Sequence, residues 1–242
     1  MTALREEDTP DALSPPPSDD GRPDLARRAL MEAIGAFAIV FAGCGAVVAD
    51  ATSDGSLGGV GISLVFGLIV MVMIYAGGHL SGAHYNPAVT VAFALGRHFP
   101  PREAVTYVAA QLSGGIAGAL LLLAAWPEAP GDLGATVPSV GVGAALLYEV
   151  VLTAFLMFVI TAVATDTRAA GAAAAIAIGG TVALDALFGG PVTGASMNPA
   201  RSLGPALAAG QWTDFWIYVA GPVAGAALGV FGYRLVRGVN RA

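Results

Sequence analysis

The chain has 242 residues, of which 56% are hydrophobic and only 12% are charged, and its mean hydropathy is +0.72. Soluble domains carry about 25% charged residues, so this composition indicates a membrane protein. The eleven basic residues are all Arg and are outnumbered by seventeen acidic residues, which argues against nucleic acid as a partner.

The N-terminal segment, residues 1–24, differs from the rest of the chain. It holds seven acidic residues and five Pro but only two Arg. A stretch of this composition cannot bury enough apolar surface to fold, so we expect a disordered tail. It also lacks the basic region and the apolar run of a signal peptide.

Six apolar stretches are long enough to cross a membrane, because a hydrocarbon core of about 30 Å needs roughly 20 helical residues. Two further apolar runs, 86–96 and 198–208, are too short, because each would rise only about half of that distance as a helix. The predicted fold is therefore an all-α membrane protein with six transmembrane helices and two re-entrant half-helices. The expected spans lie at about residues 25–48, 57–78, 102–126, 140–165, 169–189 and 212–236.

The Arg residues predict the orientation of these spans. If the N-terminus is cytoplasmic, ten of the eleven Arg fall in the tail or in cytoplasmic segments, as the positive-inside rule requires. An even number of spans then places the C-terminus in the cytoplasm as well. The exception is Arg201, which lies inside the second short run. A guanidinium at that depth costs about 2.5–3.5 kcal/mol even on insertion-based scales. We therefore expect Arg201 to have a function.

The two halves of the chain resemble each other. The segment MEAIGAFAIVFAGCGAV resembles YEVVLTAFLMFVITAVA, which pairs Glu32 with Glu149, and GGIAGALL resembles GPVAGAAL, which pairs Gly114 with Gly221. Each half has three spans and one short helix. Because three is odd, the second half must enter the membrane from the opposite side, as in an inverted repeat. The small residues spaced four apart in the paired segments favour close helix contact.

One tripeptide, Asn-Pro-Ala, begins both short runs. Asn is a strong N-cap residue and Pro is favoured at the first helical position. A single copy would be an ordinary capped turn. Two copies at equivalent places in an inverted repeat predict opposed half-helices whose Asn side chains meet near the midplane, with their NH₂ groups turned outward. The residues concerned are Asn86, Pro87, Ala88, Asn198, Pro199 and Ala200.

The backbone ahead of each Asn is predicted to be irregular. Such backbone is tolerated at membrane depth only where protein covers it or a water-filled cavity lines it. Its carbonyl groups are candidates for a ladder of hydrogen-bond acceptors along a pore: Gly82, Ala83, His84, Gly194, Ala195 and Ser196. Intramembrane acids suggest function by default, but the twofold placement of Glu32 and Glu149 suits a structural task. We expect each carboxylate to accept N–H groups from the loop of its own half.

Several other polar residues give no sign of a metal or catalytic site. Cys44 lies in an apolar run and is interpreted as a small buried residue. His79 and His84 have no Cys or acid at ligand spacing, so no metal site is expected. Asp185 has no evident partner in the sequence.

These motifs resemble those of the aquaporin, or major intrinsic protein, family over roughly residues 30–236. The runs GASMNPARSLGPA and VMVMIYAGGHLSGAHYNPAVT are most similar to the nodulin-26-like subgroup. The resemblance implies an aquaporin-like channel domain over residues 25–242, with repeats at about 25–126 and 140–236. It also implies a homotetramer in the cell membrane, with one pore per subunit for water and small uncharged solutes. No cofactor is expected, and the lipid bilayer is the other partner.

The resemblance further implies an aromatic/arginine constriction formed by Phe66, Ala186, Ala195 and Arg201. Water-selective members usually carry His at the position of Ala186, so the small residue predicts a wider pore. Glycerol, urea, ammonia and undissociated metalloid hydroxides are the candidate solutes. The positive ends of the two half-helices are expected to exclude protons and other cations. Two alternatives stay open: a strictly water-selective channel, and an ion-coupled secondary transporter, since inverted repeats are common in that class.

Overall fold

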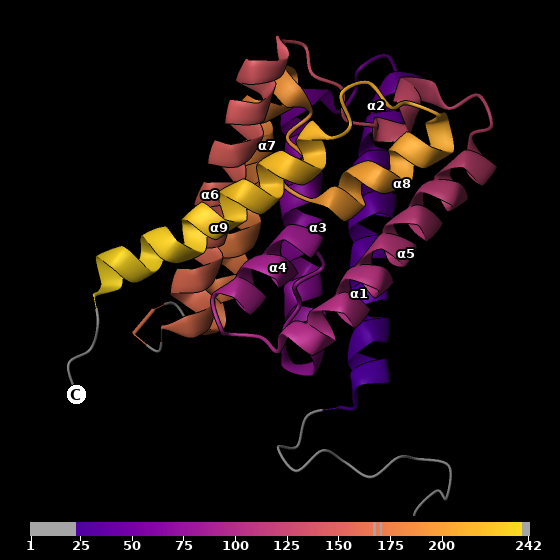
Figure 1. Cartoon of the computed structure of the whole chain (residues 1–242). Coiled ribbons are helices and arrows are strands. Elements are labelled where there is room, and N and C mark those ends of the chain that lie inside the picture. The colour runs from indigo at the N-terminus through magenta and orange to yellow at the C-terminus, as the bar shows by residue number, and fades with distance from the viewer. Residues whose placement is uncertain (1–22, 167, 170, 239–242) are drawn as a thin grey trace, which may run out of the picture.

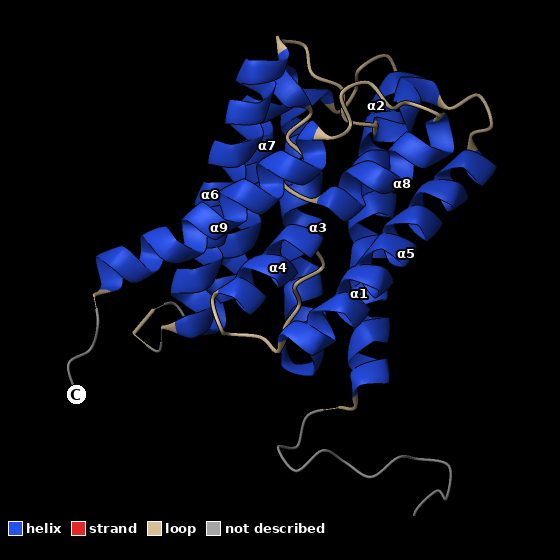
Figure 2. Cartoon of the chain, viewed as in Figure 1, coloured by secondary structure: helices blue, strands red, loops and turns tan. Residues whose placement is uncertain are grey.

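The computed structural model describes residues 23–166, 168–169 and 171–238, and every regular element within them is helical (Figures 1 and 2). The predicted tail, residues 1–24, lies outside the described residues except for its last two. Six helices of this part of the chain are long and apolar enough to cross a membrane. They are Leu25–Thr52, α3 (Gly58–Ser81), α5 (Pro101–Ala125), α6 (Val142–Thr165), α7 (Ala174–Thr193) and α9 (Ile217–Arg237).

The six predicted spans are confirmed, although five boundaries differ by three or more residues, among them the ends of the second span at Ser81 and of the fifth at Thr193. The first span continues to Thr52 and consists of α1 (Leu25–Ile39), a π-helical turn η1 (Val40–Cys44) and α2 (Gly45–Thr52). The fifth begins at Ala174 rather than at 169, after a polar segment in which Arg168 pairs with Asp166 (2.6 Å) and the short turn η3 (Gly171–Ala173). The sixth begins at Ile217 rather than at 212, because Asp214 has a positive φ of 49° that a helix cannot contain.

The two predicted half-helices are present as α4 (Pro87–Leu95) and α8 (Pro199–Ala209). Nine and eleven residues rise only about 14 and 17 Å, which is about half of a hydrocarbon core. Figure 1 shows α4 and α8 between the long helices. Each packs on the last span of the opposite half, α4 on α9 and α8 on α5.

The helix contacts repeat between the halves. Helix α1 packs along α5 and α6 packs along α9, while α1 contacts α3 as α6 contacts α7. The two halves meet along α3 and α7. A short turn, η2 (Pro130–Gly134), lies against α2 and α8 in the connection between the halves.

The predicted pairing of Gly114 with Gly221 is wrong by one helical turn. A Cβ at Gly114 would overlap the carbonyl oxygen of Ala33. The residue that meets the equivalent oxygen, that of Val150, is Gly225. Small residues recur every four positions along α9, at Gly221, Gly225 and Gly229, so the sequence pattern fits two registers that differ by about one turn.

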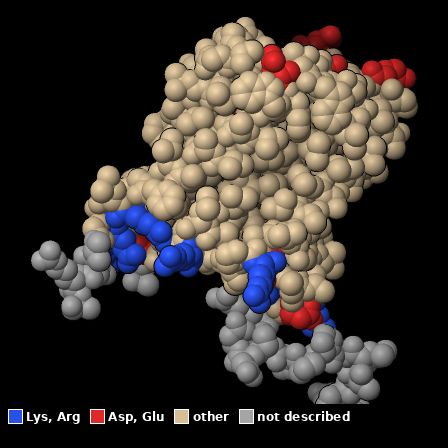
Figure 3. All heavy atoms as spheres, in the orientation of Figure 1, with Lys and Arg blue, Asp and Glu red and all other residues tan. Residues whose placement is uncertain are grey.

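Basic side chains gather at one end of the molecule, the end at which α1 begins and α9 ends (Figure 3). Acidic side chains are visible beside them and also at the opposite end, where no basic side chain is visible. Between the two ends, the visible surface carries neither kind, as a belt in contact with lipid requires. The described Arg residues that flank helix termini at the basic end are Arg27, Arg28, Arg97, Arg102, Arg168, Arg234 and Arg237.

We expect Gly114→Ala to lower the melting temperature of the detergent-solubilised protein. The added methyl group must separate α5 from the backbone of α1, and overpacking of this kind costs about 1–3 kcal/mol. Gly180→Ala in α7 is the matched control. Nothing lies within 4 Å of a Cβ at Gly180, so this variant should gain up to about 1 kcal/mol of helix propensity. Equal melting temperatures for the two variants would contradict the close α1–α5 contact.

Candidate functional site

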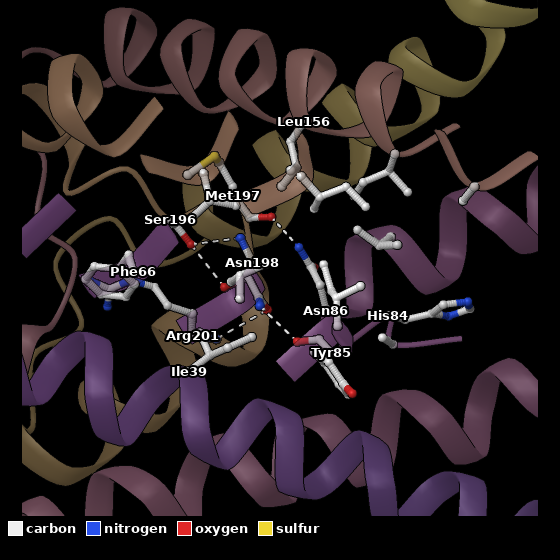
Figure 4. Close-up of a pocket in the computed structure, with 18 of the residues that line it drawn as sticks. Ile39, Phe66, His84, Tyr85, Asn86, Leu156, Ser196, Met197, Asn198 and Arg201 are labelled. Atoms are coloured by element: carbon white, nitrogen blue, oxygen red, sulfur yellow. Dashed lines mark hydrogen bonds between the residues drawn. The ribbon is translucent and has the colours of Figure 1, made fainter. Parts of the chain in front are cut away.

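Two asparagines join the half-helices at the centre of the molecule (Figure 4). Asn86 is the N-cap of α4, and its Oδ1 accepts the N–H of Ala88 (2.9 Å). Asn198 is the N-cap of α8, and its Oδ1 accepts the N–H groups of Ala200 (2.9 Å) and Arg201 (3.3 Å). Both caps have extended backbone angles, and each is followed by Pro at the first helical position. The local sequence therefore produces both helix starts, as expected of these residue types.

The sequence predicts that both asparagine NH₂ groups are directed outward, but each group uses one of its hydrogens for a bond within the protein. Asn86 Nδ2 donates to the carbonyl of Met197 (2.8 Å), and Asn198 Nδ2 donates to the carbonyl of Tyr85 (3.0 Å). Each half-helix is thus tied to the loop that precedes the other. Because an amide nitrogen carries two hydrogens, each Asn keeps one N–H for another acceptor. Pairwise contacts of this kind cannot be read from either motif alone.

A buried carboxylate organises the first loop. Glu32 is 0% exposed and accepts the backbone N–H groups of His84 (3.0 Å) and Tyr85 (2.6 Å). It also accepts the hydroxyl of Ser81 (2.7 Å) and the amide of Gln111 (2.7 Å). Four donors from three segments therefore meet on one side chain.

The second loop has the same arrangement. Glu149 is also 0% exposed and accepts the N–H groups of Ser196 and Met197, both at 2.9 Å, and the hydroxyl of Thr193 (2.7 Å). Tyr218 then donates to the carbonyl of Thr193, as Tyr107 does to that of Ser81 in the first half. Both carboxylates therefore accept N–H groups from the loop of their own half, as the sequence predicts.

Both loops contain residues with positive φ. Ala83 (52°) and Tyr85 (50°) in the first loop correspond to Ala195 (42°) and Met197 (53°) in the second. Non-glycine residues in this region are strained, at a cost of about 1–3 kcal/mol each, and persist only where surrounding contacts enforce them. A regular helix cannot contain such residues, so the chain is non-helical ahead of each Asn.

A cavity of about 140 Å³ runs past both loops and both asparagines. Most residues predicted for the carbonyl ladder line it: Gly82, Ala83, His84, Ala195 and Ser196. The exception is Gly194, which ends α7 with a φ of 82° and lies against Thr136. Apolar side chains, among them Ile39, Leu156 and Val182, form the rest of the wall. The cavity wall therefore combines residues of both loops with apolar side chains.

The four residues predicted for the constriction, Phe66, Ala186, Ala195 and Arg201, line this same cavity. Arg201 is 5% exposed, and its Cζ lies 4.7 Å from the centroid of the Phe66 ring. At this distance the guanidinium and the ring attract each other. The structure thus brings together one cation, one aromatic ring and two methyl groups.

The sequence does not predict two of the hydrogen-bond partners of the Arg201 side chain. Arg201 Nη1 donates to the carbonyl of Gly134 (2.6 Å) and to Sγ of Cys44 (3.3 Å). Cys44 is buried, as predicted, and its Sγ also contacts the Arg201 side chain. Gly134 lies 67 residues from Arg201 along the chain, in a loop whose sequence gives no sign of this contact.

A second, more polar cavity of about 460 Å³ opens at the basic end. It is lined by His79, His84 and His98 together with Arg28. Burial, with Arg234 and Arg237 nearby, lowers the pKa of His98, so this imidazole is neutral at pH 7. Among the described residues, no group of three or more His, Cys, Asp or Glu side chains is placed to hold a metal ion.

Asp185 remains without an explanation in the described structure. It precedes Ala186 on α7 and is 0% exposed, and both of its carboxylate oxygens lack a hydrogen-bond partner among the described residues.

Comparison with known proteins yields one family and a consistent set of relatives. The family described as Major intrinsic protein matches residues 21–233. Aquaporin NIP1-1 of Zea mays is 46% identical over 215 residues, which is 89% of this chain and 76% of the relative. Putative aquaporin NIP4-1 of Arabidopsis thaliana is 46% identical over 213 residues, or 88% and 75%. The X-ray structure of the aquaglyceroporin from Plasmodium falciparum superimposes with a TM-score of 0.77 at 25% identity, covering 87% of this chain and 96% of that one.

We expect Glu149→Gln to lower both the melting temperature and the water permeability per molecule in proteoliposomes. A Gln side chain has one acceptor oxygen, whereas Glu149 uses both oxygens for three donors. At least one donor loses a hydrogen bond to a charged group, which is worth about 1.5–3 kcal/mol. The control is Glu103→Gln, which removes a partly exposed pair with Arg28 worth about 0–1 kcal/mol. Equal effects in the two variants would show that the loop does not depend on the Glu149 carboxylate.

Proposed function

This chain belongs to the major intrinsic protein family and forms a membrane channel for water and small neutral solutes, and we propose that its constriction is wide enough to pass solutes of the size of glycerol. The observation that carries the proposal is the presence of Ala186 and Ala195 beside Arg201 in the cavity wall. Two methyl groups leave more room than the His that water-selective members usually place at the first of these positions.

The chemistry of the wall supports a solute with both polar and apolar faces. Arg201 and the loop carbonyls offer a donor and a row of acceptors. Phe66 and the aliphatic residues add apolar surface to the same cavity. A polyol such as glycerol has hydroxyl groups along one edge and C–H groups along the other, so it matches both kinds of surface. Urea, ammonia and undissociated metalloid hydroxides are small, neutral and rich in hydrogen-bonding groups, and they fit the same description.

We propose that the same residues exclude cations and protons. The N-termini of α4 and α8 meet at Asn86 and Asn198, and each contributes about half a positive charge. The free N–H of each Asn donates to the oxygen of a passing water, which interrupts the orientation of the water file. Arg201 adds a full positive charge at the constriction. This combination of half-helix dipoles and an Arg is established for aquaporin-type pores.

We propose a homotetramer with both termini in the cytoplasm. The basic end carries both chain ends of the described structure, and an excess of Arg is typical of cytoplasmic segments. Family membership supports the tetramer. A cell-membrane location agrees with the six apolar helices.

Stopped-flow light scattering on proteoliposomes tests the wide constriction. We expect osmotic responses to water, glycerol, urea and boric acid that are faster than in empty liposomes and independent of proton or sodium gradients. Water flux without glycerol flux would favour the strictly water-selective alternative and contradict the proposal. Flux that requires an ion gradient would instead favour a secondary transporter.

We expect Ala186→His to narrow the constriction. The imidazole fills space that a methyl group leaves open, and a change of a few atoms in a tight pocket alters discrimination by about tenfold or more. Glycerol permeability should therefore fall by about that factor, while water permeability persists. Leu184→His is the matched control, because Leu184 lies on the same helix and is 60% exposed on its outer surface. An unchanged ratio of glycerol to water permeability in Ala186→His would show that Ala186 does not face the constriction.

A further inference from the structure

The first span contains an irregular turn that has no part in the function proposed for the pore. Residues Val40–Cys44 form a π-helical turn between α1 and α2. Turns of this kind insert one residue into an α-helix, are costly, and occur frequently at functional sites. Gly43 and Cys44 are both buried in this turn, and neither is among the described residues that line the pore cavity.

Gly43 lies directly behind the Phe66 ring. A Cβ at this position would overlap three ring atoms, Cε1, Cδ1 and Cζ. The ring therefore rests on the backbone of the turn, and any side chain at Gly43 would displace it. Phe66 lines the cavity and Gly43 does not, so a side chain at Gly43 would displace the ring toward the cavity. The same displacement would alter the contact of the ring with Arg201, whose Cζ lies 4.7 Å from the ring centroid.

Cys44 contacts Arg201, the residue that pairs with the Phe66 ring. Its Sγ is 3.3 Å from Arg201 Nη1 and 3.9 Å from the carbonyl oxygen of Gly134, which accepts from the same Nη1. Gly134 has a φ of 73°, and a Cβ there would lie 2.9 Å from that of Cys44. The thiol, the loop carbonyl and the Phe66 ring thus bound the guanidinium on three sides.

We propose that the π-turn positions the constriction from outside the pore, with Gly43 setting the place of the Phe66 ring and Cys44 setting the place of the Arg201 guanidinium. Both are positioning residues, because they act through Phe66 and Arg201 and contact no solute. The proposal rests on the proposed role of those two residues in the constriction. It predicts that two adjacent residues outside the cavity alter selectivity in opposite directions.

The test measures the ratio of glycerol to water permeability in proteoliposomes. Gly43→Ala should displace the Phe66 ring into the cavity that it lines and lower the ratio by about tenfold, the discrimination that one methyl group can produce in an apolar pocket. Cys44→Ala should let the guanidinium move into the space left by sulfur and raise the ratio. Cys44→Ser, which keeps a polar atom at that position, should return the ratio toward that of the unmodified protein.

Val48→Ala is the control for a purely structural effect. Val48 is fully buried in the same span and is not among the cavity-lining residues, so this variant should lower the melting temperature and leave the ratio unchanged. If Gly43→Ala fails to insert, the Cys44→Ala and Cys44→Ser pair still decides the question.

Ala186→His separates failure of this inference from failure of the proposed function. If Ala186→His lowers the ratio while the Gly43 and Cys44 variants leave it unchanged, the π-turn does not position the constriction and only this inference is overturned. If Ala186→His also leaves the ratio unchanged, the proposed constriction is itself wrong, and the inference falls with it.

Discussion

The hydrogen bonds that Glu32 and Glu149 accept are the constraint on which the pore depends. A non-helical chain at membrane depth has no lipid partner for its N–H groups, so protein or water must satisfy them. Each carboxylate accepts two consecutive backbone N–H groups and at least one side-chain donor. These bonds hold positive-φ residues that would otherwise relax. These contacts support a structural role for both acids, because each carboxyl group finds its hydrogen-bond partners within the protein.

The two loops also depend on each other, because Asn86 donates to Met197 and Asn198 donates to Tyr85. Each loop is thus satisfied partly by its own carboxylate and partly by the cap of the opposite half-helix. This exchange joins the two loops directly. It also fixes the direction of the one N–H that remains on each Asn, since the planar amide cannot turn without breaking the cross-bond.

Much of this arrangement follows from local sequence, and the remainder does not. Hydropathy determines the six spans, and Asn followed by Pro determines where each half-helix begins. The pairing of the third and sixth spans was misplaced by one turn, because recurring Gly residues in α9 fit two registers equally well and only contact with α6 selects one. The contact of Cys44 and Gly134 with Arg201 joins three distant segments. No pattern in any one of those segments indicates it.

The two halves are closely symmetric at the midplane and differ at the proposed constriction. These two regions suit two different tasks, a barrier to cations and discrimination among neutral solutes. The residue three positions after Asn198 is Arg201, whereas the residue three positions after Asn86 is Val89, which also lines the cavity. The first span has a π-turn, whereas the corresponding α6 runs unbroken from Val142 to Thr165. A barrier to cations needs only opposed dipoles, which symmetry supplies. Discrimination among neutral solutes needs a shaped opening, and the proposed constriction lies where the halves differ.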